Sequence, residues 1–319
     1  MLQKVLVLVL GMASIALGTG CGTTANNYVY ATLPATNQII AWREDPNSGY
    51  LTQLTGSPYA AGEGANSVVL HPSGKFLYTS NPGQGENDIS LFSVATNGTL
   101  KEVFPRTPVT PSASQPEFLA MDPAGNYLYV ANAASENISV FSIDASAGTL
   151  SPVTGSPFAI GLPPQNMKLT PSGNFLYVTA PSQPYGLIIG YSVTAGVLSS
   201  IGVTSTAGLN PSGLVIDPKG SYLYTGNSSS NSISIFSISS TGGLTAVAQS
   251  PINDSYTSPL SLTFDPTGTY LYVANEGSAN VTVFSISSST GLPAILTTST
   301  TTGAFSTEPN PSFLAFDPK

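Results

Sequence analysis

Hydrophobic and polar positions alternate along most of the chain with a period of two. Residues 137–143 read NISVFSI, and similar runs occupy residues 88–94, 231–238 and 280–286. Successive side chains of a β-strand point to opposite faces, so this alternation gives each run one apolar face. No period of 3.6, which would predict a helix, follows residue 20. The pattern therefore predicts an all-β protein.

A second element recurs between these runs and consists of an apolar strand, an Asp-Pro-x-Gly turn and an aromatic strand. Residues 122–132 read DPAGNYLYVAN, residues 217–227 read DPKGSYLYTGN, and residues 265–275 read DPTGTYLYVAN. Asp, Pro and Gly suit the first, second and fourth positions of a type I turn. The prolines of these turns are Pro72, Pro123, Pro171, Pro218, Pro266 and Pro318. Steps of 47 to 52 residues between them fit the four-stranded blades of a β-propeller.

The two ends of the repeat region each carry part of a blade. Residues 312–319, SFLAFDPK, match a first strand and its turn, and residues 27–31, NYVYA, match a second strand. We expect them to join in a composite blade, one strand from the C-terminus and three from the N-terminus, that leaves no open sheet edge. Five complete units and this one give six blades, or seven if the chain is a truncated product.

The segment before the repeats has the features of an export signal. Lys4 precedes an apolar run over residues 5–17, which is shorter than the ~20 apolar residues of a membrane-spanning helix. The only cysteine, Cys21, follows three small residues. This arrangement resembles a bacterial lipoprotein signal, in which the cysteine carries the lipid. An ordinary signal peptide with an incidental cysteine is the alternative.

These features predict three segments and a location. We expect a signal peptide at residues 1–20, a lipidated Cys21 and tether at 21–27, and the propeller at 28–319. The protein would then be exported and lipid-anchored in the cell envelope, at the outer membrane or the cell surface.

Composition excludes several classes of function. The formal charge is −8 with 8 Lys and Arg, so no basic field is present to bind nucleic acid. One Cys and one His exclude a disulfide framework, a multi-cysteine zinc site and an HExxH site. The turn aspartates belong to separate blades, and the turn accounts for each of them. We expect no metal, no cofactor and a monomer.

The repeats resemble a known family. The LYVAN and LYVTA strands, the Asp-Pro-x-Gly turn and the NISVFSI strand look like those of the lactonase-type β-propellers. That family includes propeller-type 6-phosphogluconolactonases and carboxymuconate cyclases, alongside YVTN-repeat surface proteins. The resemblance covers residues 27–319 and implies a propeller, usually with seven blades. The sites proposed for the family combine His, Glu and Arg, whereas His71 here takes the place of a turn aspartate and is interpreted as structural.

Propeller ligands usually lie at one mouth of the central channel. The residue five positions before each turn Asp position should line that mouth, although a solvated strand start would explain the same polarity. These residues are Asn66, Glu117, Gln165, Ser212, Leu260 and Ser312. Glu117 is the ionisable one, and Arg106 lies eleven residues upstream in the same loop. Glu117 as a base and Arg106 beside an oxyanion would suit the opening of a lactone.

Two functions from different classes follow. The first is a membrane-anchored propeller that binds a small carbohydrate-like ligand, a glycan or an envelope partner without catalysis. The alternative is a lactonase-like hydrolase that opens a sugar lactone at the channel mouth. The sequence favours the binding scaffold, because the His, Glu and Arg combination of the family is not matched.

Overall fold

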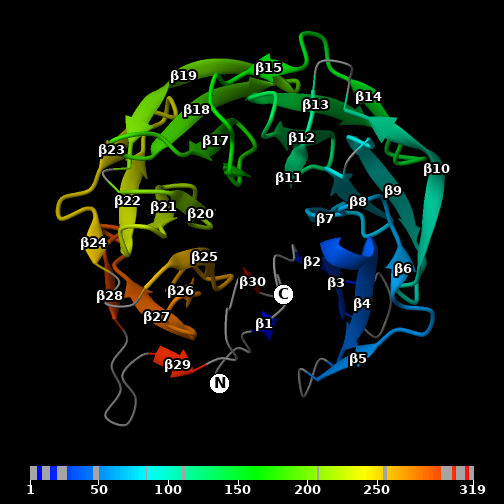
Figure 1. The fold of residues 1–319 in the computed structure, drawn as a ribbon. Helices are drawn as coiled ribbons and strands as arrows, with labels where there is room; N and C mark the ends of the chain where they lie inside the picture. The colour runs from blue at the N-terminus through cyan, green and yellow to red at the C-terminus, as the bar shows by residue number, and fades with distance from the viewer. Residues whose placement is uncertain are drawn as a thin grey trace. The chain divides into compact units, whose positions relative to one another are not determined.

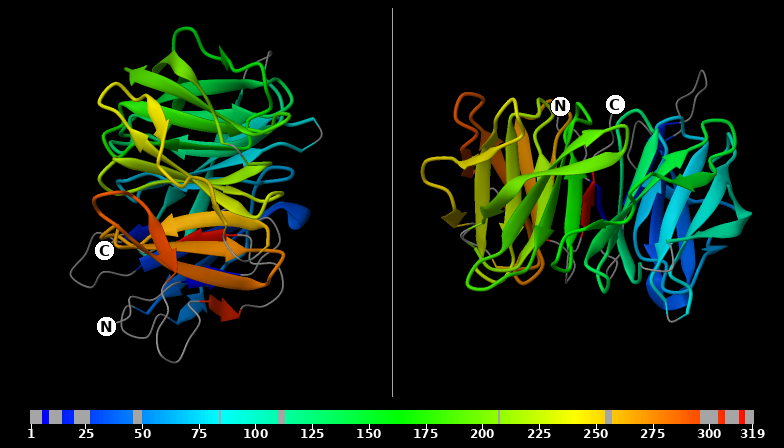
Figure 2. Two further views of the ribbon diagram at one scale, coloured as in Figure 1. Left: turned by 90° about the vertical axis from the view of Figure 1, so that its left-hand side faces the viewer. Right: turned by 90° about the horizontal axis from the view of Figure 1, so that it is seen from above.

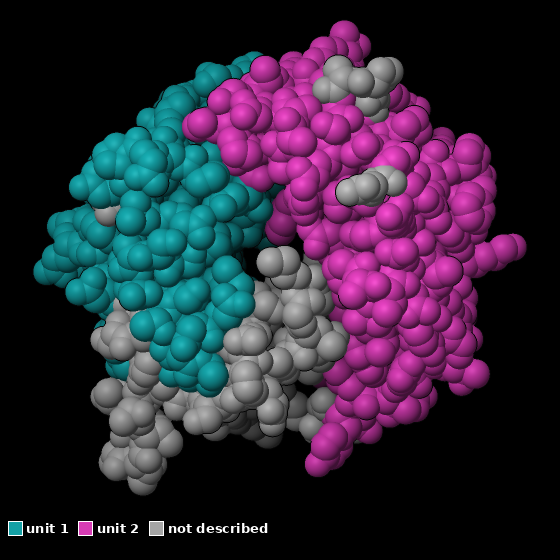
Figure 3. Space-filling view, viewed as in Figure 1, with its two compact units in different colours: residues 1–11, 165–194, 198–319 teal, residues 12–164, 195–197 magenta. Residues whose placement is uncertain are grey.

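The computed structural model falls into two compact units. Unit 1 contains residues 1–11, 165–194 and 198–319, and unit 2 contains residues 12–164 and 195–197 (Figure 3). The residues that the structure describes are 6–8, 15–19, 27–45, 50–83, 85–109, 113–206, 208–253, 257–295, 304–306 and 313–315.

Unit 2 contains three antiparallel sheets whose strands follow one another in sequence order (Figure 1). The first consists of β2 (Ile15–Thr19), β3 (Asn27–Leu33), β4 (Gln38–Glu44) and β5 (Leu51–Gln53), with β6 (Tyr59–Ala60) also on β4. The second consists of β7 (Val68–Leu70), β8 (Phe76–Asn81), β9 (Asp88–Val94) and β10 (Leu100–Pro108). The third consists of β11 (Pro116–Met121), β12 (Tyr127–Asn132), β13 (Asn137–Ile143) and β14 (Leu150–Pro152), with β15 (Phe158–Ala159) also on β13.

Unit 1 repeats the same meander (Figure 2). Its first sheet consists of β16 (Asn166–Leu169), β17 (Phe175–Ala180), β18 (Leu187–Thr194) and β19 (Val197–Ser205, whose first residue is assigned to unit 2). The second consists of β20 (Pro211–Ile216), β21 (Tyr222–Asn227), β22 (Ser232–Ile238) and β23 (Leu244–Ala246), with β24 (Ile252–Asn253) on β22. The third consists of β25 (Pro259–Phe264), β26 (Tyr270–Asn275), β27 (Asn280–Ile286) and β28 (Pro293–Ile295), with β29 (Ala304–Ser306) on β27. A separate two-stranded sheet pairs β1 (Leu6–Leu8) with β30 (Phe313–Ala315).

The strand order confirms the predicted all-β propeller with six four-stranded blades. Each blade begins with the apolar strand, and the aromatic and alternating strands follow it across the sheet. Among the described residues, the 3-10 helix η1 (Pro34–Thr36) is the one helical element.

The predicted composite blade is wrong. The partner of β3 is β2, with Ile15 opposite Ala31 and Leu17 opposite Val29, whereas β30 pairs with β1. The segment predicted as a signal is apolar and β-compatible, so it meets the requirements of an inner strand as well as residues 313–315 do. It also lies close to β3 in sequence, so pairing closes a much shorter loop. Cys21 lies outside the described residues.

Buried tyrosines connect adjacent blades within each unit. In four of the aromatic strands, a tyrosine side chain is almost fully buried, and its hydroxyl donates to a glycine carbonyl in the hairpin of the next blade. The pairs are Tyr30 to Gly98 (2.8 Å), Tyr78 to Gly148 (2.6 Å), Tyr177 to Gly242 (2.7 Å) and Tyr224 to Gly291 (2.6 Å). The aromatic residue two positions earlier supports the same hairpin: a Cβ on Gly148 would come within 2.6 Å of the Phe76 ring. The repeated aromatic motif is therefore an attachment between blades.

The turns have the predicted chemistry. Asp217 Oδ1 accepts hydrogen bonds from the backbone N–H groups of Ser221 (2.6 Å) and Tyr222 (2.7 Å). His71, at the same repeat position, accepts at Nδ1 from the Ser73 N–H (3.0 Å), and its Nε2 lies 3.0 Å from the Gly125 carbonyl oxygen. Because a carbonyl only accepts, Nε2 carries the proton. His71 is 7% exposed and has both nitrogens engaged, in agreement with a structural role.

Candidate functional site

Glu117 and Asn66 meet where the inner strands of two adjacent blades of unit 2 begin. Asn66 precedes β7, and Glu117 is the second residue of β11. The Asn66 amide nitrogen lies 2.6 Å from Glu117 Oε2 and 3.1 Å from the Glu117 carbonyl oxygen, and donates to both. Two of the residues expected at the channel mouth are therefore in direct contact.

Burial raises the pKa of the half-buried Glu117 carboxyl above its usual range, while hydrogen bonds from Gln115 and Asn66 act in the opposite direction. Desolvation disfavours the charged carboxylate, and a donor to the charged form favours it. The net result is a carboxylate whose affinity for a proton is higher than that of an exposed glutamate. A higher proton affinity makes a carboxylate a stronger general base.

The same kind of contact occurs in unit 1. Gln165 Nε2 donates to Asn210 Oδ1 (2.8 Å), and Asn166 Nδ2 donates to the Ser212 carbonyl (3.1 Å). Ser212 Oγ in turn donates to the Pro259 carbonyl (3.3 Å). Inner-strand starts are therefore linked from blade to blade within this unit as well. Ser312 lies outside the described residues.

Arg106 is not a partner of Glu117. Its Nε lies 2.7 Å from Glu102 Oε1, and its Nη1 lies 2.8 Å from Glu86 Oε2. Arg106 belongs to β10, the outermost strand of its blade, whereas Glu117 belongs to the innermost strand of the next. The two strands lie at opposite edges of their sheets, so proximity in sequence does not bring the two side chains together.

Sequence reasoning missed the asparagines that hold the strand starts. Asn87 Oδ1 accepts from the Gln115 N–H (2.7 Å), and Asn37 and Asn231 accept in the same way from Gly64 (2.8 Å) and Ser258 (2.9 Å). All three asparagines have a positive φ, between 52° and 57°. Asn tolerates this left-handed conformation better than most residues. An Asn that recurs just before the third strand was the signal that could have identified them.

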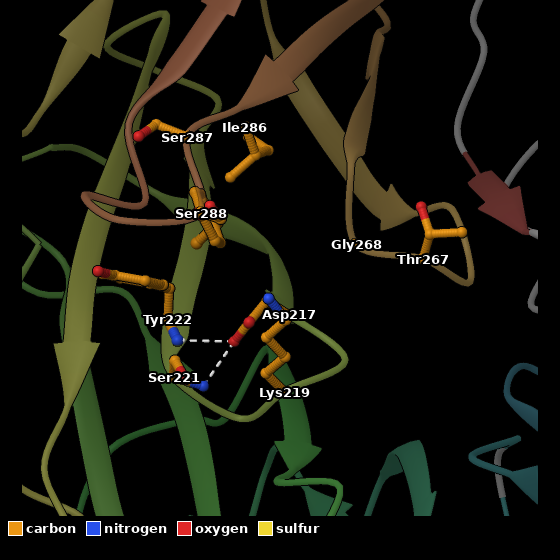
Figure 4. Close-up of a pocket in the computed structure, with 10 residues that line it drawn as sticks. Asp217, Lys219, Ser221, Tyr222, Thr267, Gly268, Ile286, Ser287 and Ser288 are labelled. Atoms are coloured by element: carbon orange, nitrogen blue, oxygen red, sulfur yellow. Dashed lines mark hydrogen bonds between the residues drawn. The ribbon is translucent and has the colours of Figure 1, made fainter.

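A pocket lies at the other end of the strands, beside the turn of Asp217 (Figure 4). Lys219, Tyr222, Thr267 and Ser287 are among the residues that line it. Figure 4 shows the Asp217 carboxylate turned toward the backbone of Ser221 and Tyr222, in the bonds given above. Because the Asp217 carboxylate already accepts hydrogen bonds within the turn, this pocket is a weaker candidate for a functional site than the start of β11.

The described part of the chain contains neither a candidate metal centre nor a candidate membrane-spanning helix. There, no group of three His, Cys, Asp or Glu side chains is placed to hold a metal ion. No helix among the same residues has the length and hydropathy needed to cross a bilayer.

Two curated relatives are named 6-phosphogluconolactonase. The protein from Formosa agariphila is 40% identical over 84 residues, which are 26% of this chain and 23% of that protein. The protein from Xenorhabdus nematophila is 29% identical over 126 residues, 39% of this chain and 35% of that protein. The aligned regions therefore span less than two fifths of either relative.

Solved structures share the fold over nearly the whole chain. A putative 6-phosphogluconolactonase from Bacteroides uniformis superposes with a TM-score of 0.78 and 20% identity, over 95% of this chain and 88% of that one. A periplasmic gluconolactonase from Pseudomonas aeruginosa gives a TM-score of 0.75 and 20% identity, over 95% and 87%.

The match to a family model is more extensive than the match to either curated relative. The model described as "Lactonase, 7-bladed beta-propeller" matches residues 22–163, 163–255 and 211–307. These ranges include every four-stranded blade except the inner strand of the first. The chain belongs to this lactonase family of β-propellers.

Proposed function

We propose that this protein hydrolyses a sugar lactone. Membership of the lactonase family and relatives named as gluconolactonases and 6-phosphogluconolactonases support a hydrolase over a binding scaffold. We assign the general base to Glu117. Its carboxylate is half-buried, has a raised pKa and accepts a hydrogen bond from Asn66 where an inner strand begins.

The reaction is the addition of water to a cyclic ester. Glu117 takes a proton from a water molecule, whose oxygen bonds to the lactone carbonyl carbon. The bond between the carbonyl carbon and the ring oxygen then breaks, and the ring oxygen leaves as a hydroxyl after receiving the proton that Glu117 took from water. The product is the open hydroxy acid. A positioned general base contributes typically 10²–10⁴-fold to the rate of such a step.

Arg106 has no part in this proposal. To stabilise an oxyanion near Glu117, its guanidinium would have to leave both Glu86 and Glu102, each less than 3 Å away. Breaking two charge-assisted hydrogen bonds costs more than one new contact returns.

The proposed location in the cell envelope is supported by the sequence and by one solved structure of the same fold. The basic and apolar start of the chain and the single Cys21 support export and a lipid anchor in the envelope. Cleavage before Cys21 would remove β2, which pairs with β3 in the full-length chain. The Pseudomonas aeruginosa structure, described as periplasmic, supports an exported protein of this fold.

Hydrolysis of glucono-δ-lactone by the full-length chain tests the function, with the spontaneous rate subtracted. We expect wild type to exceed the spontaneous rate and Glu117→Gln to lose 10²–10⁴-fold of the enzymatic rate. Glu136→Gln is the matched control, because Glu136 is an exposed glutamate of the same unit on the loop before β13. A wild-type rate equal to the spontaneous rate would refute hydrolysis of this substrate and favour the binding scaffold. Unchanged hydrolysis by Glu117→Gln would exclude this base.

A further inference from the structure

The Glu86 carboxylate connects Arg106 to the segment that leads to Asn66. Its Oε2 accepts from Arg106 Nη1 (2.8 Å) and from the backbone N–H of Glu63 (2.7 Å). The Glu63 carbonyl in turn accepts from the N–H of Gly83 (2.9 Å). Both polar groups of the Glu63 backbone are therefore held by the loop between β8 and β9. Asn66 follows three residues after Glu63, just before β7.

The next residue of the same loop holds the segment that leads to Glu117. Asn87 Oδ1 accepts from the Gln115 N–H (2.7 Å), and Gln115 lies two residues before Glu117. The Gln115 side chain also forms a hydrogen bond with the Glu117 carboxylate. The neighbouring residues Glu86 and Asn87 thus hold the two segments whose side chains meet at this carboxylate.

Three other blades make the contact equivalent to that of Glu86 without a charge. In each of them, a serine two residues before the third strand accepts from a backbone N–H of the segment that leads to the inner strand. The pairs are Ser135 with Ser114 (3.0 Å), Ser230 with Leu209 (3.0 Å) and Ser278 with Thr257 (2.7 Å). A hydroxyl therefore meets the need of the scaffold in these blades. The blade of Glu86 uses a carboxylate paired with a guanidinium instead, and hydrogen bonds between charged groups are stronger than neutral ones.

An ion pair that only stabilises its own blade is the structural explanation. Glu102 fits this explanation, because its Oε1 accepts from Arg106 Nε (2.7 Å) and from the Ser90 hydroxyl (2.8 Å), and all three residues belong to β9 or β10. Asp88, the first residue of β9, also interacts with the guanidinium. Glu86 differs from these two carboxylates, because its oxygen is shared with the segment that leads to an inner strand.

We propose that Glu86, paired with Arg106, is a positioning residue that fixes the Asn66 amide against the Glu117 carboxylate. It acts through Asn66 rather than on the substrate. A hydrogen-bond donor to a carboxylate favours the ionised form, so displacement of the Asn66 amide should make Glu117 harder to ionise. The consequence for catalysis rests on the proposed function, whereas the effect on the ionisation of Glu117 does not.

The ionisation of Glu117 can be measured without hydrolysis, by NMR titration of the full-length chain isotope-labelled at the glutamate carboxyl carbons. The signal of Glu117 is identified by its loss in Glu117→Gln. We expect this signal to titrate at higher pH in Glu86→Ala than in wild type, which is the direction also expected for Asn66→Ala. The double variant Asn66→Ala/Glu86→Ala should titrate like Asn66→Ala alone, because Glu86 acts through Asn66.

Glu102→Ala is the matched control, because it removes the other carboxylate that binds Arg106 and should leave the titration of Glu117 unchanged. The Glu102 side chain is 12% exposed and the Glu86 side chain 33%. A general loosening of the blade would therefore affect Glu102→Ala at least as strongly as Glu86→Ala. Thermal melting shows which variants are folded. If Glu86→Ala does not fold, Glu86→Ser introduces the side chain that three other blades use and should shift the titration in the same direction.

Several outcomes would overturn the proposal. An unchanged titration of Glu117 in a folded Glu86 variant would do so, as would an equal shift in Glu102→Ala or a further shift when Glu86→Ala is added to Asn66→Ala. A shift to lower pH would show instead that the Glu86 charge acts directly on Glu117. The same titration separates this proposal from the hydrolase: the expected shifts in a protein that does not hydrolyse a lactone would support the positioning role and refute only the proposed function.

Discussion

The hydroxyl groups of two equivalent tyrosines should contribute to stability with opposite signs. Tyr78 and Tyr129 occupy the same repeat position in adjacent blades of unit 2, and both are fully buried. The Tyr78 hydroxyl lies 2.6 Å from the Gly148 carbonyl oxygen, to which it donates. The Tyr129 hydroxyl has no hydrogen-bond partner among the described residues. Replacing each by Phe removes one oxygen and keeps the ring.

The magnitudes follow from the cost of unpaired polar groups. Tyr78→Phe leaves the Gly148 carbonyl without its donor, which costs ~1–3 kcal/mol. Tyr129→Phe removes a hydroxyl that was desolvated without compensation, so the free energy of unfolding should rise by ~1 kcal/mol. At ~2.1 cal/mol/K per residue, 319 residues give an unfolding entropy of ~0.7 kcal/mol/K. The melting temperature should then fall by ~1.5–4 °C in Tyr78→Phe and rise by ~1–2 °C in Tyr129→Phe.

Thermal melting and urea denaturation of the full-length chain at pH 7 are suitable assays. Burial raises the pKa of both hydroxyls, so both tyrosines are neutral at this pH and the comparison involves no change of charge. The midpoint in urea should move in the same direction as the melting temperature, with the slope of the transition unchanged. Equal shifts of the same sign in the two variants would refute the reasoning, because they would show that the Gly148 contact is not what distinguishes the sites.

Three further predictions concern the charged groups and the cysteine. A carboxylate acts as a base only when ionised, so the hydrolysis rate should rise as the pH increases through the raised pKa of Glu117. Asn66→Ala removes a hydrogen-bond donor to this carboxylate and should therefore raise its pKa further. In a pH–rate profile, the rise in rate should then occur at higher pH in Asn66→Ala than in wild type. Arg106→Met leaves two partly buried glutamates without their counter-charge and should lower the free energy of unfolding by about 1–2 kcal/mol in urea titration; an unchanged midpoint would contradict the structural role. Cys21→Ala should move the protein from the detergent-extracted membrane fraction to the soluble fraction, and identical fractionation of variant and wild type would disprove lipidation.

The blades were predictable because the signals for them are local. Alternation of apolar residues, the Asp-Pro-x-Gly turn and the step between turns each involve residues that are neighbours in sequence. The same local chemistry led to the structural interpretation of His71, whose Nδ1 accepts from the Ser73 N–H as a turn aspartate would.

The contacts between blades were not predictable from local patterns. Tyr78 and Gly148 are 70 residues apart, and nothing near either residue indicates the other. The predicted pairing of Arg106 with Glu117 was wrong for the opposite reason. The two residues are close in sequence but belong to an outermost and an innermost strand. The prediction of which strand pairs with β3 was wrong for a third reason. Two apolar segments could fill one edge, and composition does not rank them.

An internal repeat provides its own control, because each position can be compared with its copies in the same chain. His71 departs from the aspartate of other blades, and the structure explains the change through its bonds to Ser73 and Gly125. Glu117 departs from the neutral Asn, Gln, Ser and Leu of the other strand starts. At those positions, packing and hydrogen bonding within the blades are achieved with uncharged residues. A carboxylate that the scaffold does not need, in a chain with only 8% charged residues, is therefore the residue to which we assign the proposed function.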